Sequence, residues 1–387
     1  MKVSVLTTTY NREKELERLY ASLVVNNNSN IEFEWLIMDD GSTDKTKITV
    51  ENYIKQNLID IKYFYQENAG KMSAINELMK HVTGDICLTC DSDDYLVTGA
   101  FDIIEKYSNK LLEDETVYAL IFLKKGQDGK VSGNMFPENF HRSDMFSLYF
   151  REGIEGEKVL VFKTEIRKKF KHELEADEKF VTEGRMYYKM DIDYDVICIN
   201  EAIEIGDYQE DGYTKNIRKV FKENPLGHYM YFKEILEMDL TGIGFKKKMY
   251  IYKHYILFAN LAEIEHPIKN VTGFLNKVVV ALLWIPGTIK TRKMFDVKWK
   301  CQDFDKNNNL YYYSTVFKIK NNINKKHIIW NKHNADEYKH ISTVWINTAW
   351  INTVRINTVW INTVRINTVQ ANIKYNTINI YITNRYK

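Results

Sequence analysis

The residues with the clearest chemical potential are four that follow a short apolar run, Asp91-Ser92-Asp93-Asp94. The run itself, Ile86 to Cys90, has the length and composition of a buried strand. Carboxylates two positions apart at a strand's end can place one oxygen on a metal ion and another on a ribose hydroxyl. Mg²⁺ and Mn²⁺ prefer carboxylate and phosphate oxygens, and a metal here would stabilise a departing nucleoside diphosphate. An isolated match of this kind is more often a solvated turn, so the surrounding sequence decides the interpretation.

Two further polar segments fit the same chemistry. Asp39 opens the segment Asp39-Asp40-Gly41-Ser42-Thr43-Asp44, where a carboxylate could accept a hydrogen bond from a nucleobase or could simply cap the next helix. Lys71 follows Asn68-Ala69-Gly70 and opens a predicted helix. A cation is unfavourable at a helix N-terminus unless an anion lies beside it, and a phosphate would supply that anion.

The elements that must position these segments alternate between strand and helix. Strands are predicted at 3–9, 33–38, 61–65 and 86–90, with amphipathic helices between them. This alternation predicts an α/β fold with a mostly parallel central sheet covered on both faces. Ligands of such sheets bind beyond the carboxyl ends of the strands. We therefore expect the polar clusters that begin at Thr9, Asp39 and Asp91 to converge in one crevice.

The ordered set of motifs resembles the family 2 glycosyltransferases, which have the GT-A fold. The motifs are Val3-Ser4-Val5-Leu6-Thr7-Thr8-Thr9-Tyr10-Asn11-Arg12, Leu36-Ile37-Met38-Asp39-Asp40-Gly41-Ser42-Thr43-Asp44, Asn68-Ala69-Gly70-Lys71 and Asp91-Ser92-Asp93-Asp94-Tyr95. Two later stretches resemble a bacterial subgroup that builds surface polysaccharides, namely Asp177-Glu178-Lys179-Phe180-Val181-Thr182-Glu183 and Tyr208-Gln209-Glu210-Asp211-Gly212. The resemblance implies transfer of a sugar from a nucleotide-diphosphate donor, of the UDP-sugar type, to a glycan or lipid-linked acceptor by a single inverting displacement.

The resemblance also implies which residues hold the nucleotide-sugar. Thr9 and Tyr10 would line the base pocket, and Arg12 belongs to the same binding set. Asp39 would read the base, and Lys71 would lie near the nucleotide.

The remaining implied roles concern the metal and the proton. Asp91 would contact the ribose with Ser92 beside it, and Asp93 would bind the metal, Mg²⁺ or Mn²⁺. Sugar transfer to a hydroxyl also needs a general base, which in the wider family belongs to a Glu-Asp pair. This chain has Glu178 followed by a lysine at that place, so Glu178 is the first candidate base and Glu183 the second. The segment fits a solvated helix start equally well, and a helix is predicted over 178–190.

The chain divides by pattern into three regions. A GT-A catalytic domain is predicted over 1–215, a helical region over 216–300 and a low-complexity tail over 301–387. The tail repeats a five-residue unit, as in Ile346-Asn347-Thr348-Ala349-Trp350, which fits neither the strand period of two nor the helix period of 3.6. Poor order is therefore expected there, in preference to a binding array.

The net charge and the hydropathy pattern limit the kinds of partner and the cellular location that we expect for this chain. A formal net charge of +2 is too small to predict a nucleic-acid partner, because phosphate binding needs a strong basic field. Neither a signal peptide nor an apolar run of about 18 residues is found, so the chain is expected to be cytoplasmic, without a spanning helix. The apolar run 274–286, with basic residues up to 300, fits either a buried helix or peripheral contact with the inner face of the cell membrane.

Three functions compete at this stage. The leading hypothesis is an active glycosyltransferase. A non-catalytic or degraded relative that binds nucleotide-sugar or partners without turnover is the alternative, motivated by the tail and by the missing Glu-Asp pair. A phosphatase using Asp91 and Asp93 is weaker, because it explains neither Asp39 nor the helix-opening Lys71. Release of nucleoside diphosphate only when donor, metal and acceptor are all present would separate the three.

Overall fold

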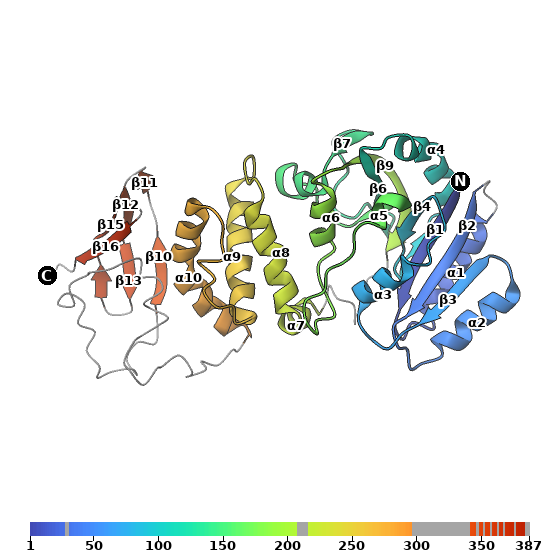
Figure 1. The fold of residues 1–387 in the computed structure, drawn as a ribbon, viewed down its shortest axis with the longest axis horizontal. Helices are drawn as coiled ribbons and strands as arrows, with labels where there is room; N and C mark the ends of the chain where they lie inside the picture. The colour runs from blue at the N-terminus through green and yellow to red at the C-terminus, as the bar shows by residue number, and fades with distance from the viewer. Residues whose placement is uncertain are drawn as a thin grey trace. The chain divides into compact units, whose positions relative to one another are not determined.

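The computed structural model describes residues 1–27, 31–206 and 216–295, and the backbone of short strands between 341 and 383. The chain forms two compact units, Met1–Val297 and Lys298–Lys387. Within the first unit, an α/β part is followed by a helical part (Figure 1). This is the α/β fold with a helical C-terminal region that the sequence predicts.

A nine-stranded mixed sheet forms the centre of the first unit, in the order β3-β2-β1-β4-β8-β6-β9-β5, with β7 also paired to β9. The half that comprises β3, β2, β1 and β4 is parallel throughout. Strand β8 then runs antiparallel to both of its neighbours, β4 and β6. The strands are β1 (Lys2–Thr9), β2 (Glu32–Asp39), β3 (Asp60–Tyr65), β4 (Ile86–Thr89), β5 (Tyr95–Leu96), β6 (Val117–Gly126), β7 (His141–Ser143), β8 (Lys158–Lys163) and β9 (Asp195–Gly206).

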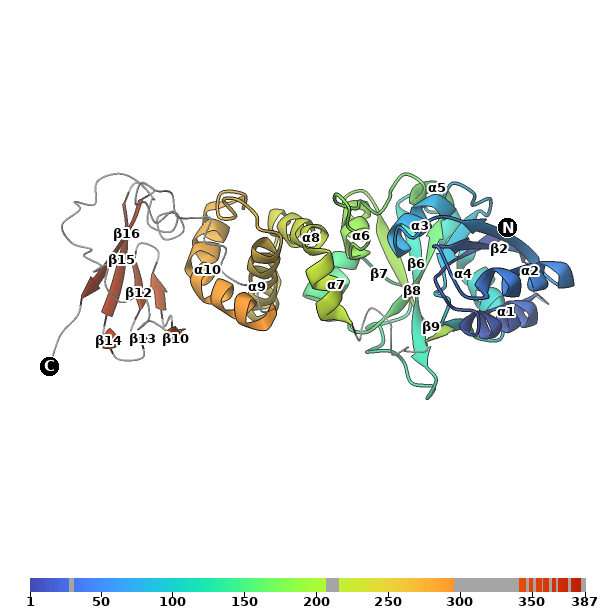
Figure 2. The same cartoon turned by 90° about the horizontal axis from the view of Figure 1, so that it is seen from below.

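Helices cover both faces of this sheet (Figure 2). One buried core lies between the sheet and helices α1, α2 and α4, and a second lies between the opposite face and helices α3, α5 and α6. Side chains alternate along β1, so that Val5 enters the first core and Leu6 the second. The helices are α1 (Glu15–Asn26), α2 (Thr46–Gln56), α3 (Lys71–Leu78), α4 (Ala100–Leu112), α5 (Thr164–Arg167) and α6 (Gly184–Met190), with one π-helical turn, η1 (Ser147–Arg151).

The register of the parallel strands positions the polar segments. Thr9 at the end of β1 lies opposite Asp39 at the end of β2, and Leu6 of β1 lies opposite Thr89 at the end of β4. The three strands therefore finish at one edge of the sheet, and the segments that follow them share that edge, as expected for parallel strands.

One predicted helix begins later than the sequence pattern suggests. The pattern predicts a helix over 178–190, but α6 starts at Gly184. The residues before α6 form a loop that is hydrogen-bonded to the start of α8 (Pro225–Glu237). The Glu178 side chain accepts hydrogen bonds from two backbone N–H groups in the first turn of α8. The side chain of Asn224, the residue before α8, accepts two more from backbone N–H groups of the loop. These contacts replace the hydrogen bonds that a helix would have made.

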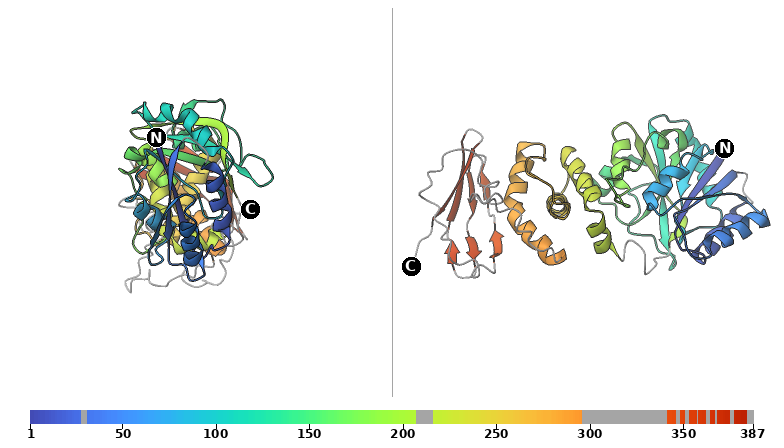
Figure 3. Two further views of the ribbon diagram at one scale, coloured as in Figure 1. Left: turned by 90° about the vertical axis from the view of Figure 1, so that its right-hand side faces the viewer. Right: turned by 60° about the horizontal axis from the view of Figure 1, so that its bottom comes forward.

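The helical part contains α7 (Ile217–Glu223), α8, α9 (Phe245–Leu261) and α10 (Phe274–Phe295), and Figure 3 shows α8, α9 and α10 in succession. Helix α9 packs against both α8 and α10. Gly287 permits the close approach of α10, because a Cβ atom there would lie 2.6 Å from Ile256 Cγ2.

Helix α10 is longer than the apolar run 274–286 indicates, because it continues through Pro286 for 22 residues in all. Among the described residues, α10 is the one helix that is long and apolar enough to cross a bilayer. No such helix was expected from the sequence. In the most apolar stretch of α10, 22% of the residues are buried. A core helix can be equally long and apolar, so length and composition alone do not make α10 a span.

Seven short strands are described within the repeat region, in one sheet of three strands and one of four. They are β10 (Ile341–Trp345), β11 (Thr348–Trp350), β12 (Thr353–Ile356), β13 (Thr358–Ile361), β14 (Val364–Ile366), β15 (Thr368–Lys374) and β16 (Thr377–Thr383). Residues 296–340 lie outside the described ranges, and the expectation of poor order over 301–387 stays a prediction.

Candidate active site

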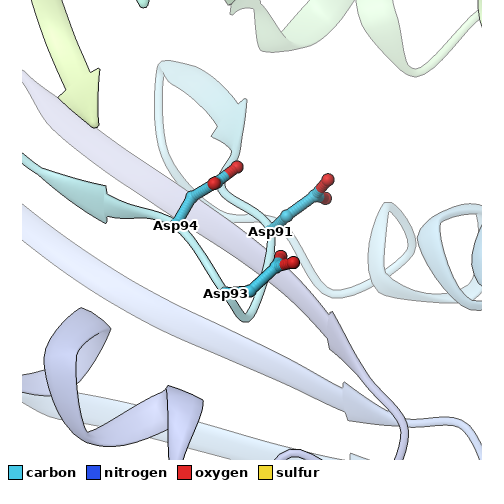
Figure 4. Close-up of side chains that lie close together, drawn as sticks. All are labelled: Asp91, Asp93 and Asp94. Atoms are coloured by element: carbon cyan, nitrogen blue, oxygen red, sulfur yellow. The ribbon is translucent and has the colours of Figure 1, made fainter. Parts of the chain in front are cut away.

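The acidic loop after β4 brings three carboxylates together. Each of Asp91, Asp93 and Asp94 offers one oxygen, and these oxygens lie within 4.8 Å of one another. Figure 4 shows the three side chains projecting from one loop toward the same side. The backbone N–H of Asp94 donates to the carbonyl of Asp91 at 3.0 Å, which closes the loop into a tight turn.

The electrostatics of this loop fit a divalent cation. Burial, and after it the nearby charges of Asp91 and Asp94, raise the pKa of Asp93 to about 6, although Arg12 acts in the opposite direction. Like charges this close repel one another, and an added cation would remove the repulsion. Three carboxylates converging from one loop are also the oxygen-rich donor set that Mg²⁺ and Mn²⁺ prefer. The residues present therefore fit the metal that the sequence implies.

Lys71 lies beside this loop at the first position of α3. Its Nζ atom is 2.8 Å from Asp91 Oδ1 and 3.4 Å from Glu183 Oε1. Burial disfavours the charged form of Asp91, but the charges of Lys71 and Lys124 and the hydrogen bond from Lys71 together outweigh it and lower the pKa of Asp91. The turn before the lysine requires Gly70, which has a φ of 94° and where a Cβ atom would lie 2.1 Å from the carbonyl oxygen of Lys179.

The two aspartates that follow β2 have different partners. Asp40 accepts hydrogen bonds from Gln66 Nε2 at 2.7 Å and from the backbone N–H groups of Ala69 and Gly70 at 2.8 Å, so it shapes the loop before Lys71. Asp39 accepts from the Ser42 N–H at 2.7 Å and from the Tyr63 hydroxyl at 2.6 Å. An ionised carboxylate has about four acceptor positions, so Asp39 retains acceptor capacity for a ligand.

The end of β1 supplies a buried hydroxyl and an exposed ring. Thr9 is buried, and among the described residues its Oγ1 atom has no hydrogen-bond partner. Tyr10, the next residue, is 48% exposed. Asn11 joins this strand end to the Asp39 segment, because its Oδ1 atom accepts the N–H of Thr43 at 2.8 Å.

Comparison with known proteins agrees with this geometry. Residues 4–166 match the family model described as glycosyl transferase family 2. This chain carries a family 2 glycosyltransferase domain.

Similarity to individual proteins is limited to part of their length. An uncharacterized glycosyltransferase of Mycoplasma genitalium is 34% identical over 121 residues, which are 30% of this chain and 41% of the relative. Poly(ribitol-phosphate) β-N-acetylglucosaminyltransferase TarS of Staphylococcus aureus is 31% identical over 139 residues, which are 36% of this chain and 24% of TarS. The chain thus matches less than half the length of each relative.

The similarity in fold extends further along the chain. The crystal structure of S. aureus TarS 1–349 in complex with UDP-GlcNAc aligns with a TM-score of 0.50 and 18% identity. The alignment covers 79% of this chain and 95% of that one. At this identity the likeness concerns the fold, which is that of a GT-A glycosyltransferase with a helical region after it.

Within the glycosyltransferase domain, the two candidate bases occupy different surroundings. Both oxygens of Glu178 accept backbone N–H groups at the start of α8, from Leu226 and Gly227, each at 2.6 Å. Glu183 contacts Lys71 and accepts the Tyr187 hydroxyl at 2.8 Å. Because Lys71 also contacts the acidic loop, Glu183 is linked to that loop through the lysine, whereas Glu178 is bonded to the start of α8.

Other predicted residues are placed less fully. Ser92 is buried within the acidic loop. Arg12 lies close enough to Asp93 to influence its pKa. The motif Tyr208-Gln209-Glu210-Asp211-Gly212 lies outside the described residues.

Sequence reasoning missed part of the site. Lys124 and Glu204 lie on β6 and β9, and Lys124 Nζ approaches Asp94 Oδ2 to 2.5 Å and Glu204 Oε1 to 3.2 Å. Tyr63 on β3 orients Asp39. The sequence did contain one signal for the role of Lys124. This lysine follows seven consecutive hydrophobic residues, which are buried in β6, and a charge in such a position needs a partner of opposite charge.

Proposed function

We propose that the glycosyltransferase domain transfers a sugar from a nucleotide-diphosphate donor, of the UDP-sugar class, to a hydroxyl acceptor in surface glycan synthesis. The observation that carries the proposal is the convergence of the acidic loop, Lys71 and Glu183 at the edge of the sheet where β1, β2 and β4 end. A divalent metal held by Asp93, with Asp91 beside it, would act as a Lewis acid on the departing diphosphate. The UDP-sugar class is also supported by the UDP-GlcNAc bound in the TarS structure.

The residues of the chain bind and orient the donor. Asp39 accepts a base N–H, and Thr9, whose buried hydroxyl has no partner among the described residues, lies opposite Asp39 at the end of β1. Tyr10 offers an exposed aromatic ring for packing against the base. Lys71 brings positive charge to the phosphate side of the site and holds Asp91 in place.

Glu183 removes the acceptor proton. Burial disfavours its charged form, but the nearby charge of Lys71 and the hydrogen bond from the Tyr187 hydroxyl act in the opposite direction, and the pKa of Glu183 is lowered, so the carboxylate is ionised at neutral pH. The acceptor hydroxyl gives its proton to Glu183 as its oxygen bonds to the anomeric carbon. The bond from that carbon to the nucleoside diphosphate breaks in the same step, so the configuration inverts.

Turnover with a panel of nucleotide-sugars tests this function. The full chain with Mn²⁺ and a UDP-sugar should release UDP faster when an acceptor is supplied, with the sugar found on the acceptor by mass spectrometry. Donor binding without transfer to any glycan or lipid-linked acceptor would favour the alternative, a non-catalytic relative that binds nucleotide-sugar without turnover. Phosphate release from a simple phosphomonoester would favour the phosphatase reading.

Asp39→Asn should weaken UDP binding by about tenfold, which corresponds to roughly 1.4 kcal/mol, because a charge-assisted hydrogen bond to the base is lost. The substitution keeps the side-chain volume and can still accept the Ser42 N–H. Calorimetric titration with UDP measures the effect. Tyr63→Phe is the matched control, since it removes one partner of Asp39 and leaves the carboxylate, and it should change the affinity by less than about threefold. An unchanged affinity of Asp39→Asn would remove Asp39 from the base site.

We also propose that α10 attaches the enzyme peripherally to an anionic membrane surface. The buried residues of α10 recur every three or four positions from Val280 to Phe295, so one face packs inward. Outside this face, Phe274 is 50% exposed, Leu275 is 76% exposed and Ile289 is 42% exposed. The helix also carries Lys277, Lys290, Arg292 and Lys293, and apolar side chains beside basic ones suit the headgroup boundary of an anionic leaflet. Lys298 and Lys300, in the same predicted segment, lie outside the described residues.

Co-sedimentation with anionic liposomes tests this contact. The full chain should bind vesicles that contain phosphatidylglycerol, and binding should fall as salt rises. The double variant Lys290→Glu and Lys293→Glu should reduce the bound fraction by at least about fivefold, since each basic residue near the surface contributes about 1 kcal/mol. Lys80→Glu with Lys130→Glu, two exposed lysines of the catalytic domain, serves as the charge-matched control. Wild-type protein that stays in the supernatant at low salt would instead favour the reading of α10 as an ordinary packing helix.

A further inference from the structure

A buried ion cluster lies behind the acidic loop. Lys124 of β6 places its Nζ atom 2.5 Å from Asp94 Oδ2, 3.0 Å from Glu157 Oε2 and 3.2 Å from Glu204 Oε1. Lys124, Asp94 and Glu204 are each less than 9% exposed. Charges buried to this degree are retained only where they are paired, so this lysine is a fixed part of the structure and not a solvated surface group.

The three carboxylates come from different parts of the fold. Asp94 ends the acidic loop, Glu157 precedes β8 and Glu204 lies on β9. Lys124 therefore ties the loop to β6, to β9 and to the segment before β8, as Lys71 ties it to α3 from the other side through Asp91. The acidic loop is held by one lysine at each end.

The backbone near Lys124 is arranged to admit this contact. Gly206, at the end of β9, lies so close that a Cβ atom there would be 2.6 Å from Lys124 Cε and 3.4 Å from Asp94 Oδ1. Strand β5, which begins directly after Asp94, pairs with β9, and its Leu96 lies opposite Glu204. The loop that carries Asp93 is thus fixed at its C-terminal end by strand pairing and by the Lys124 contact together.

We propose that Lys124 is a positioning residue, which holds the acidic loop through Asp94 in the orientation that lets Asp93 bind the metal. The inference rests on the proposed metal-assisted transfer, and it assigns a specific duty to a residue that touches neither donor nor metal. Loss of Lys124 should weaken binding of Mn²⁺, while UDP binding measured without metal stays within about twofold of wild type.

Two variants separate positioning from simple loss of the fold. Lys124→Met alone would leave buried carboxylates unpaired, which is strongly destabilising. The double variant Lys124→Met with Glu204→Gln removes one of these charges and still lacks the contact with Asp94. Lys124→Arg keeps the positive charge, so the cluster stays neutralised, but its larger planar head group does not fit the close approach to Gly206 without shifting Asp94. Lys130→Met, an exposed lysine in the turn after β6, is the matched control.

The direct readout is Mn²⁺ binding in the presence of UDP, followed by the electron paramagnetic resonance signal of free Mn²⁺. The double variant should raise the Kd for Mn²⁺ by at least about tenfold. Lys124→Arg should raise the Kd for Mn²⁺ by at least about threefold, because the guanidinium shifts Asp94, and Lys130→Met should equal wild type. Circular dichroism and thermal melting confirm that the variants compared are folded. If the double variant does not fold, the test rests on Lys124→Arg. A folded Lys124→Arg protein with a weakened Mn²⁺ affinity then supports the positioning role.

Three results would overturn the proposal, in distinguishable ways. A folded double variant with wild-type Mn²⁺ affinity would remove the positioning role and leave the proposed function untouched. If only Lys124→Arg folds and its Mn²⁺ affinity equals that of wild type, Lys124 is a structural residue alone. Wild-type protein that binds no Mn²⁺ with UDP would contradict the metal-assisted function itself and this inference with it.

Discussion

Asp93→Asn is expected to lower kcat/KM for metal-dependent sugar transfer by about 10³-fold, because it removes the central carboxylate of the acidic loop. That loss corresponds to about 4 kcal/mol of transition-state stabilisation, in the range that a metal ion supplies to a departing oxyanion. The substitution preserves the size of the side chain, so the loss is one of charge. Initial rates of UDP release, measured over a range of Mn²⁺ concentrations, check the prediction.

The same substitution should not destabilise the fold. The pKa of Asp93 in the folded chain is raised from 3.8 to about 6, chiefly by burial. An acid with a raised folded-state pKa lowers the free energy of unfolding as the pH rises from about 4 to about 6, because the unfolded chain loses the proton first. Asp93→Asn lacks this effect, so its melting temperature at pH 7 should equal or exceed that of wild type.

An exposed aspartate provides the control for this pair of measurements. Asp128→Asn, in the turn after β6, removes one negative charge that pairs only with Lys130 among the described residues, and it should leave both rate and melting temperature unchanged. Near-wild-type turnover by Asp93→Asn would exclude Asp93 from the metal site. A large fall in its melting temperature would show that Asp93 has a structural role.

Glu183→Gln is expected to reduce kcat by about 10² to 10⁴-fold, the usual range for a positioned general base, with UDP affinity within about threefold of wild type. The glutamine retains the shape of the side chain and cannot accept the proton. The residual rate should lose its dependence on an ionised carboxylate, so the acid limb of the pH–rate profile seen in wild type should disappear.

Glu178→Gln is the matched comparison, since the two residues competed as candidates from the sequence. Glu178 caps the first turn of α8 through two backbone N–H groups, so its substitution should lower stability by roughly 1 kcal/mol, the typical contribution of a cap, with kcat within a few-fold of wild type. The reverse result, a large loss of kcat for Glu178→Gln and a small one for Glu183→Gln, would restore Glu178 as the base.

The parts of the site that the sequence predicted are those set by local pattern. Asp39 and Asp91 each end a short apolar strand, and parallel strands must finish at one edge of a sheet, so their convergence follows without coordinates. A helix that opens with a cation calls for an anion, and a phosphate was expected from the sequence beside Lys71; in the structure the carboxylate of Asp91 lies beside the lysine, and the phosphate stays a prediction. The alternating pattern predicted an α/β fold with a mostly parallel sheet, and the resemblance to family 2 glycosyltransferases implied the GT-A fold.

The parts that escaped prediction depend on contacts between distant segments. Our proposal of Glu183 in place of Glu178 rests on α8, which lies more than forty residues further on and donates backbone hydrogen bonds to the carboxylate of Glu178. The role of Lys124 depends on Glu204 and Asp94, which no local pattern connects to β6. The apolar run 274–286 does not by itself show that α10 continues past Pro286 to Phe295, because a proline inside a helix removes a backbone hydrogen bond.

The central claim is that the edge of the sheet around Asp39, Lys71 and Asp93 is a nucleotide site completed by a divalent metal. Calorimetric titration of the full chain with UDP, with and without Mn²⁺, tests this most directly. We predict saturable binding of one UDP per chain that becomes at least about tenfold tighter with Mn²⁺, a gain of about 1.4 kcal/mol. No measurable binding of UDP in either condition would contradict the account.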